Sequence, residues 1–483
     1  MGGAKRCRDS LTNNHRLIIQ APSTTSDPRK HWAATLHDAV GASFLRADSR
    51  KLLVRIGVSA GDIDPYYWLS RLNQSDRIVW HARHHNEIVF ACGSACVVSG
   101  DGPSPHDQID QEVSEILNRP GDEMRFYGGL RFDQEYDPDE IWSAFSGYRF
   151  VLPRFEFISR GDQIQVYCNL VFPEDHDHRE NILMEILAFE TEPAGLLESG
   201  SVPVLIGREN HPERDVWAER ITWALNKFEE NGLEKVVLAR RADLYFESPI
   251  EPFKLLKQLL ASTPNCFHYH FEAPDGSAFI GATPERLFYR NGLTIESEAV
   301  AGTQPRGETV LDDEVFRASL LTSEKELREH AYVREYIRNV LAEFCESVSI
   351  DHEASEMKLT RGRHLVSRIT GVLRASISNL EILKSLHPTP AVSGFPNQYS
   401  VDVIREVEEF DRGWYAGPVG WIGRDAAHFA VALRCGLIRG NTLALFSGAG
   451  IVKGSEPLSE WKEIEQKILD FINVLELDLE RTQ

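Results

Sequence analysis

Near the end of the sequence, two glutamates and a lysine are spaced so that they could act together. Glu460, Glu463 and Lys467 follow one another at intervals of three and four residues, which places them on one face of a helix. Ser455 and Pro457 are typical of a helix start. Two carboxylates beside an amine could bind a cation and an anion, or could form a partly buried salt bridge. The spacing is compatible with both.

The elements around this helix predict that its acids flank a buried seam. Apolar residues recur on the helix at the helical period and must pack inward. The segment just before it, Gly448, Ala449 and Gly450, is predicted to be a bend with free backbone N–H groups. The apolar positions are Trp461, Ile464, Ile468, Phe471, Ile472 and Leu475.

Lys235 begins a short predicted strand that ends at Arg240. It shares one face with Val237 and Ala239, so its side chain points toward apolar surroundings. The amine could reach water along its aliphatic stem, or burial could keep it neutral enough to act as a base.

A helix predicted over residues 323–346 carries acids where apolar residues are expected. Its apolar stripe, extended one turn toward the N-terminus, reaches Glu326 and Glu329. Burial of an unpaired carboxylate costs several kcal/mol, so Glu329 requires an Arg or Lys partner or a metal ion. The stripe consists of Val333, Tyr336, Ile337, Val340 and Phe344.

Two further charged residues belong to predicted strands, Glu285 at the break between two strands and Arg434 within one. Glu285 follows Pro284, before a hairpin predicted at Asn291-Gly292, and could be a cap or a general acid. Arg434 is predicted to share a strand face with Ala430 and Ala432, which leaves room for a ligand carboxylate or for an ordinary salt bridge.

The composition limits the possible partners. The 483 residues carry a formal net charge of -21, which argues against nucleic acid. No apolar run is long enough for a membrane span. Seven scattered cysteines without a zinc spacing predict reduced thiols and a cytoplasmic protein. Residues 1–30 hold six basic and two acidic residues, which predicts a disordered tail or, alternatively, a transit-type segment.

A set of motifs in a fixed order resembles the chorismate-utilising enzymes, most closely the isochorismate synthases. Several motifs in one order are specific, whereas any one alone is weak. The match covers roughly residues 210–475. The strings are Lys235-Val-Val-Leu-Ala-Arg, Gly281-Ala-Thr-Pro-Glu, Ala301-Gly-Thr-Gln-Pro-Arg-Gly, Ser323-Glu-Lys-Glu-Leu-Arg-Glu-His, His387-Pro-Thr-Pro-Ala, Tyr415-Ala-Gly-Pro-Val-Gly and the stretch from Gly448 to Lys467.

The resemblance implies one large α+β domain in which two antiparallel sheets pack face to face with helices outside. That replaces the two or three domains that length alone would suggest. Residues 31–210, where no catalytic constellation is evident, are then the framework part of this domain. Residues 211–483 are its chorismate-binding catalytic part.

The resemblance also implies roles for the residues. Lys235 is similar to the base that deprotonates a water attacking C2 of chorismate, and Glu285 to the acid that protonates the departing C4 hydroxyl. Glu329, Glu463, Glu460 and Glu326 are similar to the family's Mg²⁺ ligands, whose ion holds the C1 carboxylate. The residues that contact the substrate in this family correspond to Gly302, Thr303, His364, Ala391, Tyr415, Arg434, Gly448, Ala449, Gly450 and Lys467.

Within the family, three residues favour isochorismate as the product. Relatives that use ammonia usually carry Gln at the position of Lys235, and some carry Lys at that of Ala301. Salicylate synthases typically have Thr where Ala391 stands. Ser393 and Gln304 depart from many relatives. A salicylate synthase and a silent chorismate-binding protein remain the alternatives; no glutaminase subunit is expected, and the protein is expected to be a monomer or weak homo-oligomer.

Overall fold

The computed structural model describes residues 32–474 except 48–49, 62, 73–74, 104 and 192–202. The tail predicted over residues 1–30 and the last stripe position, Leu475, lie outside the described residues.

The strands form one antiparallel hydrogen-bonded network that branches at a single long strand, β5. Strand β3 pairs along the whole of β5. Strand β4 pairs with the first part of β5, at 148–151, and β6 with its second part, at 155–160. The bounds here are β3 Glu87–Gly100, β4 Phe126–Leu130, β5 Tyr148–Arg160 and β6 Gln163–Phe172.

The first branch runs in the order β1-β6-β5-β3-β2-β9-β10-β19-β20-β8-β7, and β16 also pairs with β8. Its further strands are β1 Leu52–Ser59, β2 Ile78–His81, β7 Leu205–His211, β8 Lys235–Phe246, β9 Phe267–Glu272, β10 Ala278–Thr283, β16 Gly394–Phe395, β19 Cys435–Arg439 and β20 Thr442–Val452.

The second branch runs β4-β17-β18-β11-β12-β15-β13, and β14 also pairs with β15. Its further strands are β11 Arg286–Asn291, β12 Thr294–Pro305, β13 Cys345–Ile350, β14 Ser355–Lys358, β15 Gly362–Leu373, β17 Pro418–Ile422 and β18 Ala426–Val431.

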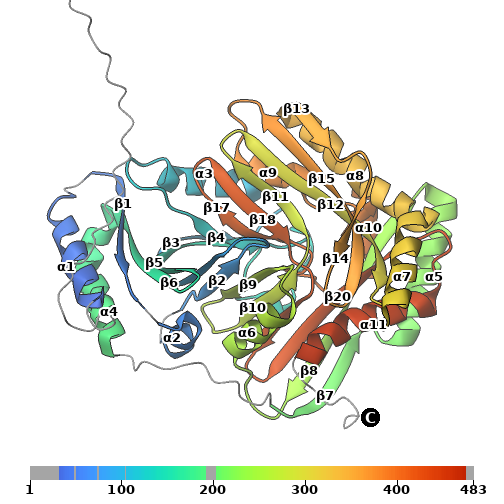
Figure 1. Cartoon of the computed structure of the whole chain (residues 1–483), viewed down its shortest axis with the longest axis horizontal. Coiled ribbons are helices and arrows are strands. Elements are labelled where there is room, and N and C mark those ends of the chain that lie inside the picture. The colour runs from blue at the N-terminus through green and yellow to red at the C-terminus, as the bar shows by residue number, and fades with distance from the viewer. Residues whose placement is uncertain are drawn as a thin grey trace, which may run out of the picture.

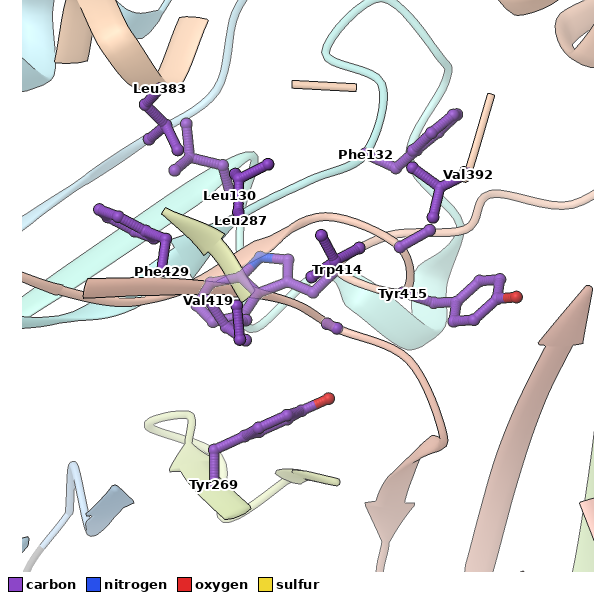
Figure 2. Close-up of a cluster of buried hydrophobic side chains, with 14 of the residues drawn as sticks. Leu130, Phe132, Tyr269, Leu287, Leu383, Val392, Trp414, Tyr415, Val419 and Phe429 are labelled. Carbon is purple, nitrogen blue, oxygen red and sulfur yellow. The ribbon is translucent and has the colours of Figure 1, made fainter. Parts of the chain in front are cut away.

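The two branches pack against each other through buried aromatic side chains. The rings of Trp80 and Phe267, from the first branch, lie 6.0 and 5.2 Å from the ring of His428 in β18. Figure 2 shows Trp414 with Val419 and nearby apolar side chains of this core. The predicted pair of packed antiparallel sheets is therefore confirmed, with the addition that β5 links the two layers.

The helices lie on the outside of the strands (Figure 1). Helix α8 packs along β12 and β15, α11 packs against β20 and α5, and α1 packs against α4 and β1. None of the helices in the described ranges has the length and apolar character needed to cross a membrane. Their bounds are α1 Trp32–Phe44, α2 Pro65–Arg71, α3 Pro105–Leu117, α4 Arg179–Thr191, α5 Arg214–Asn231, α6 Pro252–Ser262, α7 Val310–Thr322, α8 Glu324–Phe344, α9 Asn379–Leu386, α10 Asn397–Val407 and α11 Pro457–Val474.

Local sequence chemistry sets the ends of the elements near the site. The side chain of Ser323 caps α8 by accepting a hydrogen bond from the backbone N–H of Glu326. Gly292 has a φ of 61° in the turn between β11 and β12. Glycine adopts such a positive φ more readily than other residues do. The predicted Asn291-Gly292 hairpin is therefore confirmed.

Two local predictions were wrong. Gly448, Ala449 and Gly450 are not a bend but lie inside β20, where they pair with Ala239, Leu238 and Val237. Strand pairing over eleven residues outweighs the weak strand tendency of glycine.

Arg434 does not continue the strand of Ala430. Strand β18 ends at Val431, and Arg434 has a φ of 46° in the turn that precedes β19. Strand β18 pairs with β11 and β17, whereas β19 pairs with β10 and β20. The chain therefore turns between β18 and β19 and passes from one branch to the other. Arg434 therefore projects from a turn rather than from a strand face.

Candidate active site

One pocket collects most of the residues predicted for the site. All of the predicted residues line it except Lys235, Ala449 and Glu460. The described residues that line it all fall between 237 and 467, so they come from the predicted catalytic part of the chain. The predicted residues that line it are Glu285, Gly302, Thr303, Glu326, Glu329, His364, Ala391, Tyr415, Arg434, Gly448, Gly450, Glu463 and Lys467.

Lys235 lies just behind the wall of this pocket. It is the first residue of β8 and is fully buried. Its Nζ lies 2.9 Å from Oε1 of Glu329, at an angle outside hydrogen-bond geometry, so the contact is electrostatic. The structure thus places the predicted base against a carboxylate that lines the pocket.

Gly450 lines the pocket beside this ion pair. A Cβ atom at Gly450 would lie 2.9 Å from Oε1 of Glu329 and 3.1 Å from Cε of Lys235. Both distances are shorter than ordinary contacts of a Cβ atom, so a larger residue would displace the pair. Glycine at this position lets the pocket reach the two charged groups.

Glu285 lies between β10 and β11, with only 4% of its surface exposed. Burial raises the pKa of its carboxyl group to about 8, Lys235 lowers it, and the charge of Glu298 raises it further. A carboxyl group with this pKa is mostly protonated at pH 7. Glu285 can therefore donate a proton, which a surface glutamate at that pH cannot do.

The other predicted acids are near one another, but each has a partner. Glu326 accepts a hydrogen bond of 2.9 Å from the backbone N–H of Thr303. Glu460 is buried, and its Oε1 lies 3.7 Å from Nζ of Lys325. Burial and then a neighbouring carboxylate, Glu329 or Glu463 respectively, raise the pKa values of Glu326 and Glu460.

Glu463 pairs with Lys467, four residues along α11. Their Oε1 and Nζ atoms are 2.8 Å apart, and Nζ also donates to the carbonyl oxygen of Gly448 at 2.8 Å. Burial alone would raise the pKa of Glu463, but the Lys467 ammonium, together with the charges of Lys325 and Lys235, outweighs it and lowers the pKa. The salt bridge that the spacing left open therefore forms in the structure.

These carboxylates do not form an assembled metal cluster. Within the described ranges, no three His, Cys, Asp or Glu side chains converge as a ligand set. Their donor atoms are nevertheless all oxygens, the type that Mg²⁺ prefers. The charges of Glu329 and Glu463 add to burial in raising the pKa values of Glu326 and Glu460, and a divalent cation would relieve this repulsion.

Cationic and neutral donors occupy another part of the pocket. Arg434 has no carboxylate within ion-pair distance among the described residues, and its Nη2 lies 3.3 Å from Nε2 of His364. Nδ1 of His364 lies 3.1 Å from Oγ1 of Thr303. Burial, followed by the charges of Arg434 and Lys467, lowers the pKa of His364 to about 3. A neutral histidine thus leaves the guanidinium free to bind an anion.

Tyr415 and Gly448 meet in the pocket wall. A Cβ atom at Gly448 would lie 2.9 Å from the hydroxyl oxygen of Tyr415. Burial raises the pKa of Tyr415, so its hydroxyl stays protonated and can donate a hydrogen bond. Glycine in β20 thereby lets this hydroxyl approach the strand.

Two cations that were not predicted for the site also line the pocket, Lys325 and Arg412. Lys325 lies one residue before Glu326, in a motif already noted. Arg412 is buried and forms an ion pair with Glu408, and it donates to the carbonyl oxygen of Val237 at 2.7 Å. Arg412 stands three residues before Tyr415, a predicted substrate contact, and this proximity in the sequence could have pointed to it.

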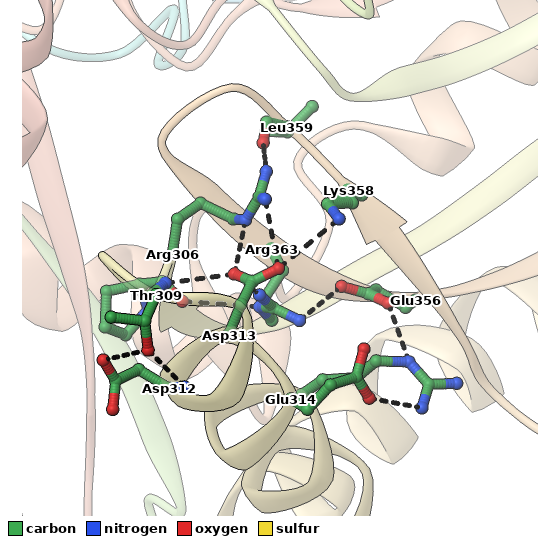
Figure 3. Close-up of polar contacts among 12 residues, drawn as sticks. Arg306, Thr309, Asp312, Asp313, Glu314, Glu356, Lys358, Leu359 and Arg363 are labelled. Atoms are coloured by element: carbon green, nitrogen blue, oxygen red, sulfur yellow. Dashed lines mark hydrogen bonds and ion pairs between the residues drawn. The ribbon is translucent and has the colours of Figure 1, made fainter.

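A polar network supports the wall formed by the end of β12 (Figure 3). Asp313 of α7 accepts hydrogen bonds from Arg306 at 2.7 Å and from the backbone N–H of Gly307 at 3.0 Å, and it also contacts Arg363. The Arg306 contact is the main reason that the pKa of Asp313 is lowered. The network joins α7 to β15, next to His364.

Comparison with known proteins identifies the family. The model of the family described as chorismate binding enzyme matches residues 36–476. The chain belongs to this family. The motif resemblance found in the sequence is therefore confirmed, and the match extends well upstream of residue 210.

Individual relatives agree with this assignment. The chain is 34% identical over 401 residues to isochorismate synthase 2, chloroplastic, of Arabidopsis thaliana, covering 81% of this chain and 71% of the relative. It is 36% identical over 353 residues to the isochorismate synthase MenF of Bacillus subtilis, covering 72% and 74%. The structure of MenF, the menaquinone-specific isochorismate synthase of Escherichia coli, is similar with a TM-score of 0.78 at 25% identity, covering 92% of this chain and all of that one.

Proposed function

We propose that the protein converts chorismate to isochorismate by adding water at C2 with loss of the C4 hydroxyl. One observation carries this proposal. A buried carboxyl group with a raised pKa, Glu285, lines the same pocket as Arg434, which has no carboxylate partner among the described residues, and a buried amine, Lys235, lies just behind the pocket wall. Glu285 and Lys235 supply an acid and a base, and Arg434 suits a carboxylate-bearing substrate.

The reaction needs both proton transfers. Water attacking C2 must lose a proton, and the hydroxyl that leaves C4 must gain one, because hydroxide is a poor leaving group. Lys235 accepts the first proton and Glu285 donates the second. A lysine at this position favours water over ammonia as the nucleophile, and Ala391 in the pocket wall favours release of isochorismate without further elimination.

Charged groups position the substrate carboxylates. Arg434 and Lys467 supply positive charge, and Thr303 and the Tyr415 hydroxyl supply hydrogen bonds. Glu326, Glu329, Glu460 and Glu463 would hold Mg²⁺, which when bound supplies the positive charge that holds the C1 carboxylate. Holding the substrate ring between Glu285 and Lys235 would speed the reaction by orienting the reacting groups, in addition to the effect of the two proton transfers.

Product analysis tests the proposal. The purified protein is incubated with chorismate and Mg²⁺, and the products are separated by chromatography. Isochorismate as the sole product supports the proposal. Salicylate with pyruvate would instead identify a salicylate synthase, and tight chorismate binding without any product would identify a silent binding protein.

A further inference from the structure

Two histidines face each other across the β2–β9 ladder and line neither the candidate site nor its walls. His81 and His268 are register partners, and their Nδ1 atoms lie 3.4 Å apart. The rings are within 18° of parallel, but their centroids are 5.6 Å apart. Because the nitrogens are much closer than the centroids, the rings meet through their Nδ1 edges.

The hydrogen bond on the far side of His81 determines where its proton lies. Nε2 of His81 is 2.9 Å from the carbonyl oxygen of His85. A carbonyl oxygen can only accept, so Nε2 must carry the proton. In the neutral ring Nδ1 then has a lone pair and no proton.

The same reasoning applies to His268. Its Nε2 lies 2.8 Å from Oγ1 of Thr263, and that hydroxyl donates its own proton to the carbonyl oxygen of Leu259 at 2.6 Å. Oγ1 must therefore accept from Nε2 of His268. Nδ1 of His268 is also left with a bare lone pair, 3.4 Å from Nδ1 of His81.

Two bare nitrogens at this distance repel each other unless a proton or a metal ion lies between them. Burial disfavours the proton, since it lowers the pKa of His81 and lowers that of His268 to about 3. His268 is fully buried, whereas His81 is partly exposed. A small cation can therefore approach from the His81 side.

We propose that His81 and His268 form a two-histidine clamp for a borderline divalent transition-metal ion such as Zn²⁺ or Cu²⁺. Two imidazole nitrogens on a tetrahedral ion, each about 2.05 Å from the metal, are about 3.3 Å apart, close to the 3.4 Å observed. The partners of the two Nε2 atoms hold the rings in the tautomer that metal binding needs.

The clamp is chemically distinct from the carboxylates of the candidate site. Neutral imidazoles favour Zn²⁺ and Cu²⁺, and Cu²⁺ binds most tightly of the common divalent ions, whereas carboxylates suit Mg²⁺. No group of three or more candidate donors occurs in the part of the chain that the structure describes. Water therefore completes the coordination, and the site is an exchangeable one.

Electron paramagnetic resonance of the Cu²⁺-loaded protein tests the clamp, with excess Mg²⁺ present to fill oxygen-donor sites. The expected spectrum shows coupling to two imidazole nitrogens. His81→Gln should remove one nitrogen and weaken Cu²⁺ binding at least about tenfold. A spectrum with oxygen ligands only, or the same affinity in His81→Gln as in the natural protein, would overturn the proposal.

Two further variants separate the clamp from nonspecific binding. Thr263→Val removes the acceptor that holds His268 without touching either ring, and should weaken binding about 10- to 100-fold. His85→Gln keeps the carbonyl oxygen used by His81 and should leave binding unchanged. Loss of binding in His85→Gln together with full binding in Thr263→Val would contradict the clamp, even where His81→Gln folds poorly.

Discussion

Nζ of Lys235 lies 2.9 Å from Oε1 of Glu329, which joins the first residue of strand β8 to helix α8. The proposed base and a proposed metal ligand therefore share one contact. Replacement of either residue alters the charge that the other experiences, so their effects on catalysis should be coupled rather than additive.

Lys235→Ala should lower the rate of isochorismate formation by about 10²- to 10⁴-fold, the usual contribution of general base catalysis. Lys235→Arg should be equally impaired, because a guanidinium group does not give up its proton at neutral pH. Initial rates measure both effects. Lys453→Ala, at an exposed lysine after β20, is the matched control, and near-normal turnover by Lys235→Ala would exclude a base role.

The pH dependence of catalysis should reflect the raised pKa of Glu285. The acid must be protonated to act, so kcat/KM should fall as the pH rises through about 8. Glu298→Gln removes a charge that raises this pKa, so the falling limb should move to lower pH. Rate profiles of the two proteins over the same buffers provide the test; coincident profiles would contradict the assignment.

Glu285 should also make folding stability depend on pH. Its folded pKa, about 8, lies above its ordinary value of 4.5, so the folded state binds more protons between these values. The Glu285 contribution is favourable below about pH 4.5 and is lost as the pH rises to 8. Glu285→Gln, which cannot ionise, should gain stability relative to the natural protein over that window. Urea unfolding at several pH values measures the difference, and a constant difference would argue against a buried, protonated Glu285.

Removal of divalent ions with a chelator should abolish activity, and Mg²⁺ should restore it. Glu329→Gln should raise the Mg²⁺ concentration needed for half-maximal rate, because it removes one of the proposed charged oxygen ligands. Glu324→Gln changes an exposed glutamate of the same helix and should behave like the natural protein. Full activity in the presence of the chelator would contradict a metal-binding role for these carboxylates.

Gly450→Ala should impair turnover without unfolding the protein. The new Cβ would press on Glu329 and Lys235 at 2.9 and 3.1 Å, and displacement of catalytic groups by a fraction of an ångström is costly. A loss of about tenfold or more in kcat is expected. Gly41→Ala is the control: its Cβ meets Leu183 only at 4.0 Å, so activity should be kept and stability should rise by about 0.5–1 kcal/mol. Equal activity of the two variants would contradict the tight packing inferred at Gly450.

Local patterns in the sequence were sufficient to predict several features. Helical spacing placed Glu326 and Glu329 on the same side as the core positions of α8, and the Asn-Gly pair marked the β11–β12 turn. These predictions rest on interactions between residues a few positions apart, which sequence spacing encodes directly. The order of the motifs likewise identified the family.

Tertiary structure decided the rest. Long-range pairing with β8 placed Gly448–Gly450 in a strand, and the pairing of β18 and β19 with different neighbours put Arg434 in a turn. The partner of Glu329, Lys235, lies far away in the chain, and the raised pKa of Glu285 depends on burial and on Glu298 in strand β12. Sequence by itself determined which residues carry charge and how neighbours share a face; which charges meet, and how far water is excluded from them, followed only from the packing of distant segments.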